Sequence, residues 1–190
     1  MKRIIICIIL LLFAINISAQ HLNFMGIPMG SHINTFSKSL ESKGFKLATG
    51  TGMNYPNFYY YSGVFAGERV GLTVIVTPST KKVFDVGVIF ADYIHYKSGL
   101  NSSYGVGVSL DKINILFNDL SRDLTKKYGV PIESEKDDPM IKKSHWFRTN
   151  EGDIHLHIEY IEEKNIVRVS LSYTDKSTDK LNSQERLNDL

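Results

Sequence analysis

The stretch SLDKINILFNDLSRDLTKKYGVP, residues 109–131, decides the fold class of this chain. Its apolar side chains recur every three or four positions, which is the spacing of an amphipathic helix. Ser109 is a suitable N-cap, while Gly129 and Pro131 are residues that end helices. The pattern predicts a helix over residues 110–128 that buries one face in a core. The residues on its apolar stripe are Leu110, Ile113, Phe117, Leu120, Leu124 and Tyr128.

On both sides of this helix, apolar and polar residues alternate with a period of two, which is typical of half-buried strands. A second, shorter helix is predicted between Ser31, its expected N-cap, and Gly44. Its apolar stripe consists of Ile33, Phe36 and Leu40. The predicted strands cover residues 59–65, 72–77, 83–90, 144–148, 154–160 and 167–173.

A helix followed by three strands thus occurs twice, and this order predicts an α+β fold. We expect two tandem helix-plus-antiparallel-sheet units, over residues 20–105 and 106–173, with their helices packed on one sheet face. Residues 174–190 contain few apolar side chains. They are predicted to form a polar flexible tail or at most a marginal helix.

Residues 1–19 have the composition of a secretory signal peptide. Lys2 and Arg3 precede an apolar run, and Ala19 is a small residue at the expected cleavage site. The run is shorter than the roughly 20 residues that cross a bilayer. We expect cleavage after Ala19, export to the periplasm or the medium, and no stable membrane anchor afterwards.

Composition limits the chemistry of the exported chain. The one cysteine, Cys7, lies in the signal segment, so no thiol or disulfide would remain after cleavage. Removing residues 1–19 leaves 171 of the 190 residues, with 20 basic and 20 acidic side chains. Because nucleic-acid binding needs a basic excess or stripe, we expect no nucleic-acid partner. We also expect no cofactor, since no complete nucleotide-binding motif is present.

Four short segments are FMGIPMG (24–30), LESKGF (40–45), YSGVFAG (61–67) and KYGVP (127–131). Together they resemble small exported proteins of Bacteroidota-type bacteria, which are mostly uncharacterised. The tandem layout is similar to the fold of β-lactamase-inhibitory protein and, more distantly, to small outer-membrane assembly lipoproteins. This chain lacks the cysteines of both. The resemblance implies an architecture rather than an activity.

Aromatic residues gather in the first predicted strand. Because neighbours on a strand point to opposite faces, either Tyr59 and Tyr61 point inward and Phe58 and Tyr60 outward, or the reverse. Exposed tyrosines provide contact area at low entropic cost. We expect Phe58, Tyr59, Tyr60, Tyr61 and Phe65 to form a binding face for a protein or glycan partner. The alternative is a second packed aromatic layer.

The segment DIHLHIE, residues 153–159, contains the densest group of candidate metal ligands. On a strand, Asp153, His155, His157 and Glu159 share one face. Imidazole and carboxylate groups at this spacing suit a first-row divalent metal, so a metal-dependent hydrolase centred on His155 and His157 is the alternative function. The same residues also suit the solvated face of a half-buried strand.

The remaining histidines give weaker signals. Trp146 is expected to enter the core, with His145 turned outward. His95 and Ser98 lack an identifiable carboxylate partner and an oxyanion site, so they do not predict a hydrolase. The leading hypothesis is therefore an exported, non-catalytic binding module. An envelope-assembly or structural protein with the same fold is a further alternative.

Overall fold

The computed structural model describes residues 21–48, 55–96, 108–134, 141–162 and 166–188. The predicted signal peptide, Ser98 and the side chain of His95 lie outside this description. The described residues form an α+β fold with three helices, one large antiparallel sheet and one small sheet, which confirms the predicted fold class.

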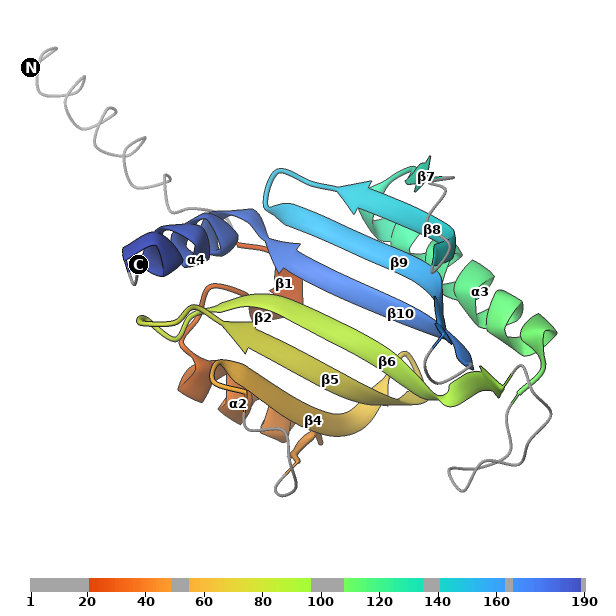
Figure 1. The fold of residues 1–190 in the computed structure, drawn as a ribbon, viewed down its shortest axis with the longest axis horizontal. Coiled ribbons are helices and arrows are strands. Elements are labelled where there is room, and N and C mark those ends of the chain that lie inside the picture. The colour runs from red at the N-terminus through yellow and green to blue at the C-terminus, as the bar shows by residue number, and fades with distance from the viewer. Residues whose placement is uncertain (1–20, 49–54, 97–107, 135–140, 163–165, 189–190) are drawn as a thin grey trace, which may run out of the picture.

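Eight antiparallel strands form the large sheet, in the order β3-β4-β5-β6-β10-β9-β8-β7 (Figure 1). Strands β6 and β10 pair at the centre of the sheet, although they are far apart in the sequence. All six predicted strands are present. The strand bounds are β3 Lys46–Leu47, β4 Phe58–Phe65, β5 Glu68–Val76, β6 Val83–Tyr96, β7 Ile132–Ser134, β8 Ile141–Arg148, β9 Gly152–Ile161 and β10 Ile166–Asp175.

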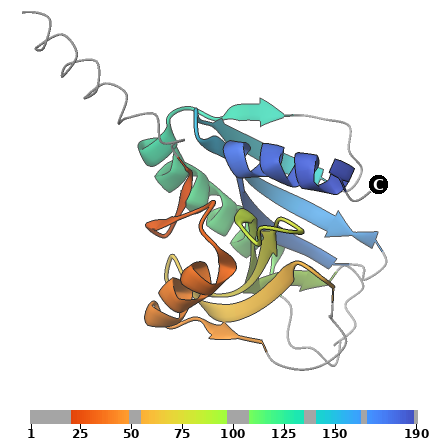
Figure 2. The ribbon, with the colours of Figure 1, turned by 90° about the vertical axis from the view of Figure 1, so that its left-hand side faces the viewer.

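Two helices, α2 (Ile33–Ser42) and α3 (Leu110–Tyr128), lie on the same side of this sheet (Figures 1 and 2). The predicted bounds of α3 are confirmed, with Ser109 as its N-cap and Gly129, at φ 88°, as its C-cap. The N-cap of α2 is His32 rather than the expected Ser31, because the His32 side chain accepts a hydrogen bond from the Asn34 amide.

The core lies between these helices and the sheet. Ile33, Phe36 and Leu40 of α2 and the apolar stripe of α3 from Ile113 to Tyr128 meet side chains from every long strand, whereas Leu110, predicted on the same stripe, is exposed. A small ribbon, β1 (Asn23–Phe24) and β2 (Ile27–Pro28), closes this side. Phe24 is fully buried and stacks on Phe65 at a centroid distance of 5.6 Å. We call this side of the sheet the helix-covered face and the other the open face.

Helix α4 (Lys176–Asn188) corrects the prediction of a polar flexible tail. It lies on the opposite side of the sheet from α2 and α3, over one end of the strands (Figure 2). Its buried residues are Thr178, Asn182 and Glu185, which are all polar. The tail is therefore ordered by hydrogen bonds rather than by apolar burial, so low hydrophobicity was a misleading signal.

Two carboxylates hold α4 in place. Asp175, which is fully buried, caps the helix by accepting from the Thr178 amide at 2.9 Å and also accepts from the Leu22 amide at 2.8 Å. At the other end, Glu185 accepts from the amides of Ser79 and Thr80 in the β5–β6 turn, at 2.7 and 3.2 Å. Among the described residues, no helix combines the length and apolar character that a membrane crossing requires.

Candidate functional site

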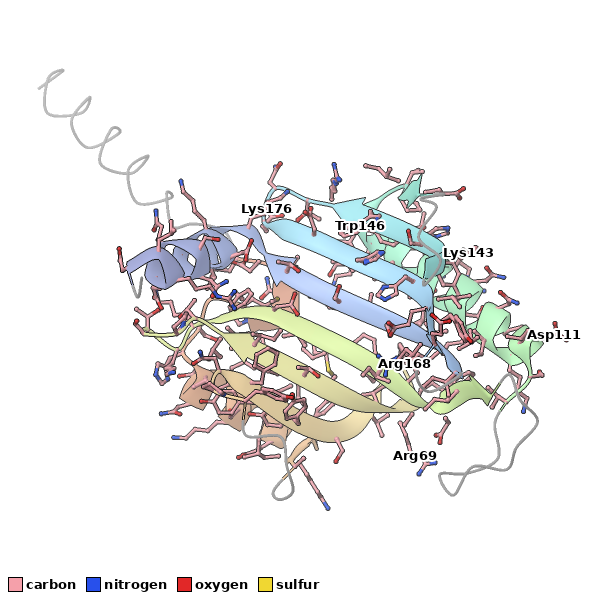
Figure 3. The ribbon with its side chains drawn as sticks, in the orientation of Figure 1. Arg69, Asp111, Lys143, Trp146, Arg168 and Lys176 are labelled. Carbon is pink, nitrogen blue, oxygen red and sulfur yellow. The ribbon has the colours of Figure 1, made fainter. Side chains whose placement is uncertain are left out.

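Strand β9 presents its polar residues to the open face, as its alternation predicted. Ile154, Leu156 and Ile158 are buried in the core, while Asp153, His155, His157 and Glu159 lie on the other side. Figure 3 looks onto this face, with Trp146 of β8 and Arg168 of β10 labelled. Both residues lie on strands that flank β9.

Trp146 and the two histidines of β9 form a continuous stack of rings. The Trp146 and His155 ring centroids are 3.8 Å apart, and those of His155 and His157 are 4.3 Å apart, with nearly parallel planes in both pairs. Trp146 lies opposite His155 in the strand register. The stack therefore places three planar side chains in one row across strands β8 and β9.

The expected orientations of His145 and Trp146 were wrong. His145 is buried on the helix-covered face, where its Nδ1 is 2.6 Å from the Ser121 hydroxyl of α3 and its ring packs on Phe117. Strand alternation then turns Trp146 to the open face. The imidazole reaches the core because α3 offers it a polar partner, which the strand sequence alone does not reveal.

Burial keeps both open-face imidazoles neutral. Desolvation lowers the pKa of His155 to about 4, and it also lowers the pKa of His157. The His155 Nε2 and His157 Nδ1 atoms are buried without a hydrogen-bond partner among the described residues. Buried polar atoms without hydrogen bonds destabilise a fold, so this part of β9 is not optimised for stability.

Glu159 and Arg168 form the charged part of this face. Glu159 Oε1 accepts from Arg168 Nε at 2.6 Å and from the Ser170 hydroxyl. Burial raises the pKa of Glu159, but these hydrogen bonds together outweigh it and hold the pKa below its ordinary value. The pair is fixed to neighbouring strands, since Arg168 lies opposite Glu159 in the register of β10 and β9.

A shallow hollow of about 200 Å³ lies beside this pair, over β5, β6, β10 and β9. Small residues line it on the central strands, namely Thr73, Gly87, Ser170 and Ser172. His157, Glu159 and Arg168 line its other side. A Cβ atom added to Gly87 would meet no heavy atom closer than 3.9 Å, so the space above this glycine is free.

The five aromatic residues of the predicted binding face divide between the two sides of the sheet. Tyr59, Tyr61 and Phe65 point to the helix-covered face, and the Tyr61 hydroxyl lies 2.5 Å from the Ser37 hydroxyl of α2. This corrects the expectation of a single aromatic face. Phe58 and Tyr60 point to the open face, as one of the two predicted alternatives required.

Phe58 also has an exposed aromatic neighbour. The ring of Tyr55, which is 64% exposed, meets Phe58 edge-on at a centroid distance of 6.1 Å. Phe58 and Tyr60 lie opposite Ile75 and Thr73 of β5, and Thr73 lines the hollow. The outward half of the aromatic run therefore flanks the hollow on one side, and the Trp146 stack lies on the other.

The histidine geometry bears on the metal alternative. An imidazole binds a metal through a lone pair in its ring plane, so two stacked and nearly parallel rings direct their lone pairs side by side rather than to one point. Within the described residues, no three His, Cys, Asp or Glu side chains are placed to hold a metal ion together. The proposal of a metal-dependent hydrolase receives no support from this arrangement.

A serine, a histidine and an aspartate do meet elsewhere, at the start of α4. His21 Nδ1 is 3.1 Å from Asp175 Oδ1 and 3.1 Å from the Ser177 hydroxyl. Because both partners meet the same ring nitrogen, the imidazole cannot pass a proton from the serine toward the carboxylate as a catalytic triad requires. The cluster instead ties the N-terminal segment to α4.

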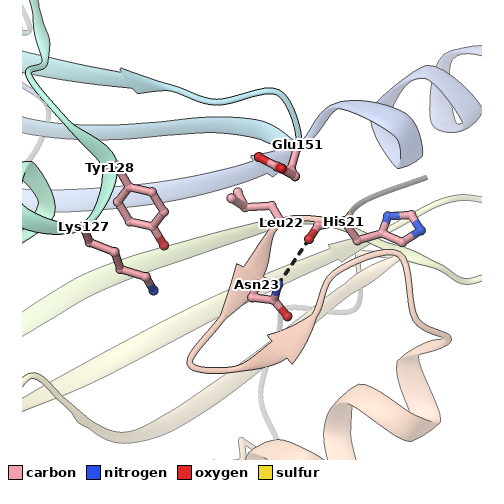
Figure 4. A pocket seen from close by; sticks show the side chains of 6 residues that line it. All are labelled: His21, Leu22, Asn23, Lys127, Tyr128 and Glu151. Carbon is pink, nitrogen blue, oxygen red and sulfur yellow. Dashed lines mark hydrogen bonds between the residues drawn. The ribbon is translucent and has the colours of Figure 1, made fainter. Parts of the chain in front are cut away.

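A second cavity, of about 220 Å³, opens between the N-terminal segment and the end of α3 (Figure 4). Lys127 and Tyr128 of α3 lie on one side of it, and Leu22, Asn23 and Glu151 lie on the other. Asn23 uses its amide to bond the His21 carbonyl at 3.2 Å. The polar groups of this cavity come from α3, the short strand β1 and the turn before β9, whereas those of the open face come from the long strands.

Sequence reasoning missed Arg168, Ser170 and Gly87. Arg168 and Ser170 alternate with the core residues Val167 and Val169 on β10, so their shared face was predictable. The pairing of β10 with β9 brings these residues against Glu159, and what the sequence did not show is that β10 also pairs with β6, which brings Gly87 beside them. The chain matches no protein family, no curated protein and no solved structure.

Proposed function

We propose that this protein is an exported, non-catalytic binding module that holds a protein or glycan partner on the open face of its sheet. The hollow beside Glu159 and Arg168 carries the proposal; the ring stack ends at it with His157, and Tyr60 lies opposite Thr73 on its other side. Rigid strands position every one of these side chains, which suits recognition of a partner without rearrangement.

The unsatisfied polar atoms on the same face add support. Two buried imidazole nitrogens without a hydrogen-bond partner among the described residues, one each from His155 and His157, belong to β9, and a further such atom belongs to Asn182 of α4, which lies over the same face. Functional surfaces are where folds tolerate such costs. In this proposal the two halves of the chain act as tandem units that join their strands at β6 and β10 to make one continuous face.

A photo-crosslinking experiment in the native host tests the proposal. A photoreactive residue is placed at Tyr60 or Thr73 on the open face, and at Ile115, which is 60% exposed on α3, as the matched control. We expect adducts of defined mass from the open-face positions and none from Ile115. Adducts from Ile115 alone would move the binding surface to the helices, and no adduct from any position would overturn the binding role.

A further inference from the structure

We infer that the hollow on the open face recognises an uncharged saccharide, an inference that rests on the binding role proposed above. The first argument is charge. The two formal charges at the hollow, Glu159 and Arg168, pair with each other at 2.6 Å, and burial lowers the pKa of the adjacent His157, which favours its neutral form. A site without net charge favours a ligand without net charge, since a charged one would be desolvated without compensation.

The bond between Arg168 and Glu159 uses only one atom of each charged group. Arg168 uses Nε for Glu159, and its terminal nitrogens have no side-chain partner among the described residues. Glu159 uses Oε1, whereas its Oε2 lies 3.9 Å from His157 Nε2, beyond hydrogen-bond distance. A fixed donor group thus lies beside a fixed acceptor group.

This pairing matches neighbouring hydroxyls on a sugar ring. A hydroxyl can donate to the carboxylate and accept from the guanidinium, so two adjacent hydroxyls satisfy both groups at once. Because the strands hold both side chains before the ligand arrives, little conformational entropy is lost when those bonds form.

The third argument is the shape and surface of the hollow. Gly87 and the short side chains of Thr73 and Ser172 leave a low floor, on which a flat ring can approach the backbone closely. Tyr60, which lies opposite Thr73, brings an aromatic ring to one flank, and on the other flank the ring stack ends at His157, which lines the hollow. Aromatic faces suit the apolar C–H faces of sugar rings, so rim and floor fit the same class of ligand.

Titration of isotope-labelled protein from Gln20 onward with neutral tetrasaccharides tests the inference by NMR. The probes are chitotetraose, cellotetraose and maltotetraose, beside tetragalacturonate as a charged saccharide and an uncharged tetrapeptide. We expect at least one neutral tetrasaccharide to shift the amide resonances of Thr73, Gly87 and Ser172, which line the hollow. Its affinity should change less than twofold between 50 and 500 mM salt, because no ion pair is formed.

Two variants and one control locate the site. Gly87→Val fills the hollow without changing its charge, and Glu159→Gln removes the charged acceptor while keeping the side-chain shape. Each should weaken saccharide binding at least tenfold. Ser62→Val introduces the same side chain on the exposed part of β4, outside the hollow, and should change the affinity less than twofold. Unchanged amide spectra away from the substituted strands show that the variants are folded.

The outcomes separate this inference from the binding role. Open-face shifts with the tetrapeptide alone would overturn the saccharide inference and leave a protein-binding face. Preference for tetragalacturonate, with steep salt dependence, would overturn the requirement for a neutral ligand. If no probe shifts any resonance but open-face crosslinks form in the host, the saccharide inference is wrong and the proposed binding role stands. No shifts and no open-face crosslinks would retire both.

Discussion

On the helix-covered face of the sheet the buried side chains are almost all apolar, and the few polar ones have partners, as His145 has in Ser121. The open face of the same strands carries a hollow, a charged pair and imidazole nitrogens that lack partners among the described residues. One set of strands thus serves two purposes. The helix-covered face stabilises the fold, whereas the open face keeps polar groups that stability alone does not explain.

The largest expected loss of stability comes from a substitution in the core on the helix-covered face. Phe117→Ala removes a fully buried ring from α3 and should lower the free energy of unfolding by about 3 to 5 kcal/mol, because the core cannot fill the cavity. Urea unfolding followed by circular dichroism measures the change. Tyr60→Ala is the open-face counterpart and should cost less than about 1 kcal/mol. Equal losses would contradict the division of purposes between the faces.

A smaller loss is expected at the anchor of α4. Asp175→Ala should destabilise the protein by about 2 to 3 kcal/mol at pH 7, because the amides of Leu22 and Thr178 lose a charged acceptor. Burial raises the pKa of Asp175, but its hydrogen bonds outweigh this and lower the pKa overall. The contribution is therefore present at neutral pH and lost as pH falls through the lowered pKa.

Thermal unfolding of wild type and Asp175→Ala between pH 7 and pH 2.5 measures this dependence. The control is Asp119→Ala, which removes only an exposed pair with Arg122 and should cost less than about 0.5 kcal/mol. A constant difference between wild type and Asp175→Ala over the whole range would show that the carboxylate charge is irrelevant to the anchor.

The third prediction concerns Asp85 on the open face. Burial raises the pKa of Asp85 to about 6, against a stabilising hydrogen bond from Thr174. Because the folded pKa lies above the unfolded value, ionisation opposes folding, and stability decreases as pH rises from about 4 through 6. Asp85→Asn should therefore raise the free energy of unfolding by about 1 to 2 kcal/mol at pH 7.5 and leave it nearly unchanged at pH 4.

Chemical unfolding at both pH values checks the sign. Glu41→Gln, on the exposed part of α2, is the matched amide control and should show no such pH dependence. Destabilisation by Asp85→Asn at pH 7.5 would mean that the ionised carboxylate is held by partners stronger than Thr174.

The smallest effect is expected in the ring stack. His155→Leu removes a buried nitrogen without a described partner, so stability at pH 7.5 should change by less than about 1 kcal/mol. The pKa of His155 lies at about 4 in the fold, below that of an unfolded histidine. Wild type should therefore lose stability as pH falls from about 6.5 to 4, and the variant should lose less.

The measurement is the difference between the pH profiles of stability of wild type and His155→Leu, because the two proteins should be almost equally stable at neutral pH. If His155→Leu lowers the free energy of unfolding by more than about 2 kcal/mol at pH 7.5, the ring stack stabilises the fold. The open face would then contribute to stability as the helix-covered face does. His155→Phe separates the contribution of ring stacking from that of the buried nitrogen, because phenylalanine keeps an aromatic ring but has no ring nitrogen.

Local patterns were enough for most elements of the fold. The 3.6-residue stripe of α3 and its cap at Ser109 are properties of a short segment, and so are the alternating residues of β9 and β10. Periodicity also showed which residues share a face. Periodicity did not show which of the two faces the helices cover. Both faces of a strand can carry aromatic or polar residues, as Tyr59 and Tyr60 do on opposite faces of β4.

What only the tertiary structure decided depends on partners distant in sequence. His145 is buried because Ser121 of α3 is beside it, and α4 is ordered because Asp175 and Glu185 find backbone amides of Leu22, Ser79 and Thr80. The candidate site has the same origin. Glu159 and Arg168 meet across the β9–β10 pair, and Gly87 joins them only because β6 pairs with β10, a strand far away in the sequence; no local period encodes that pairing.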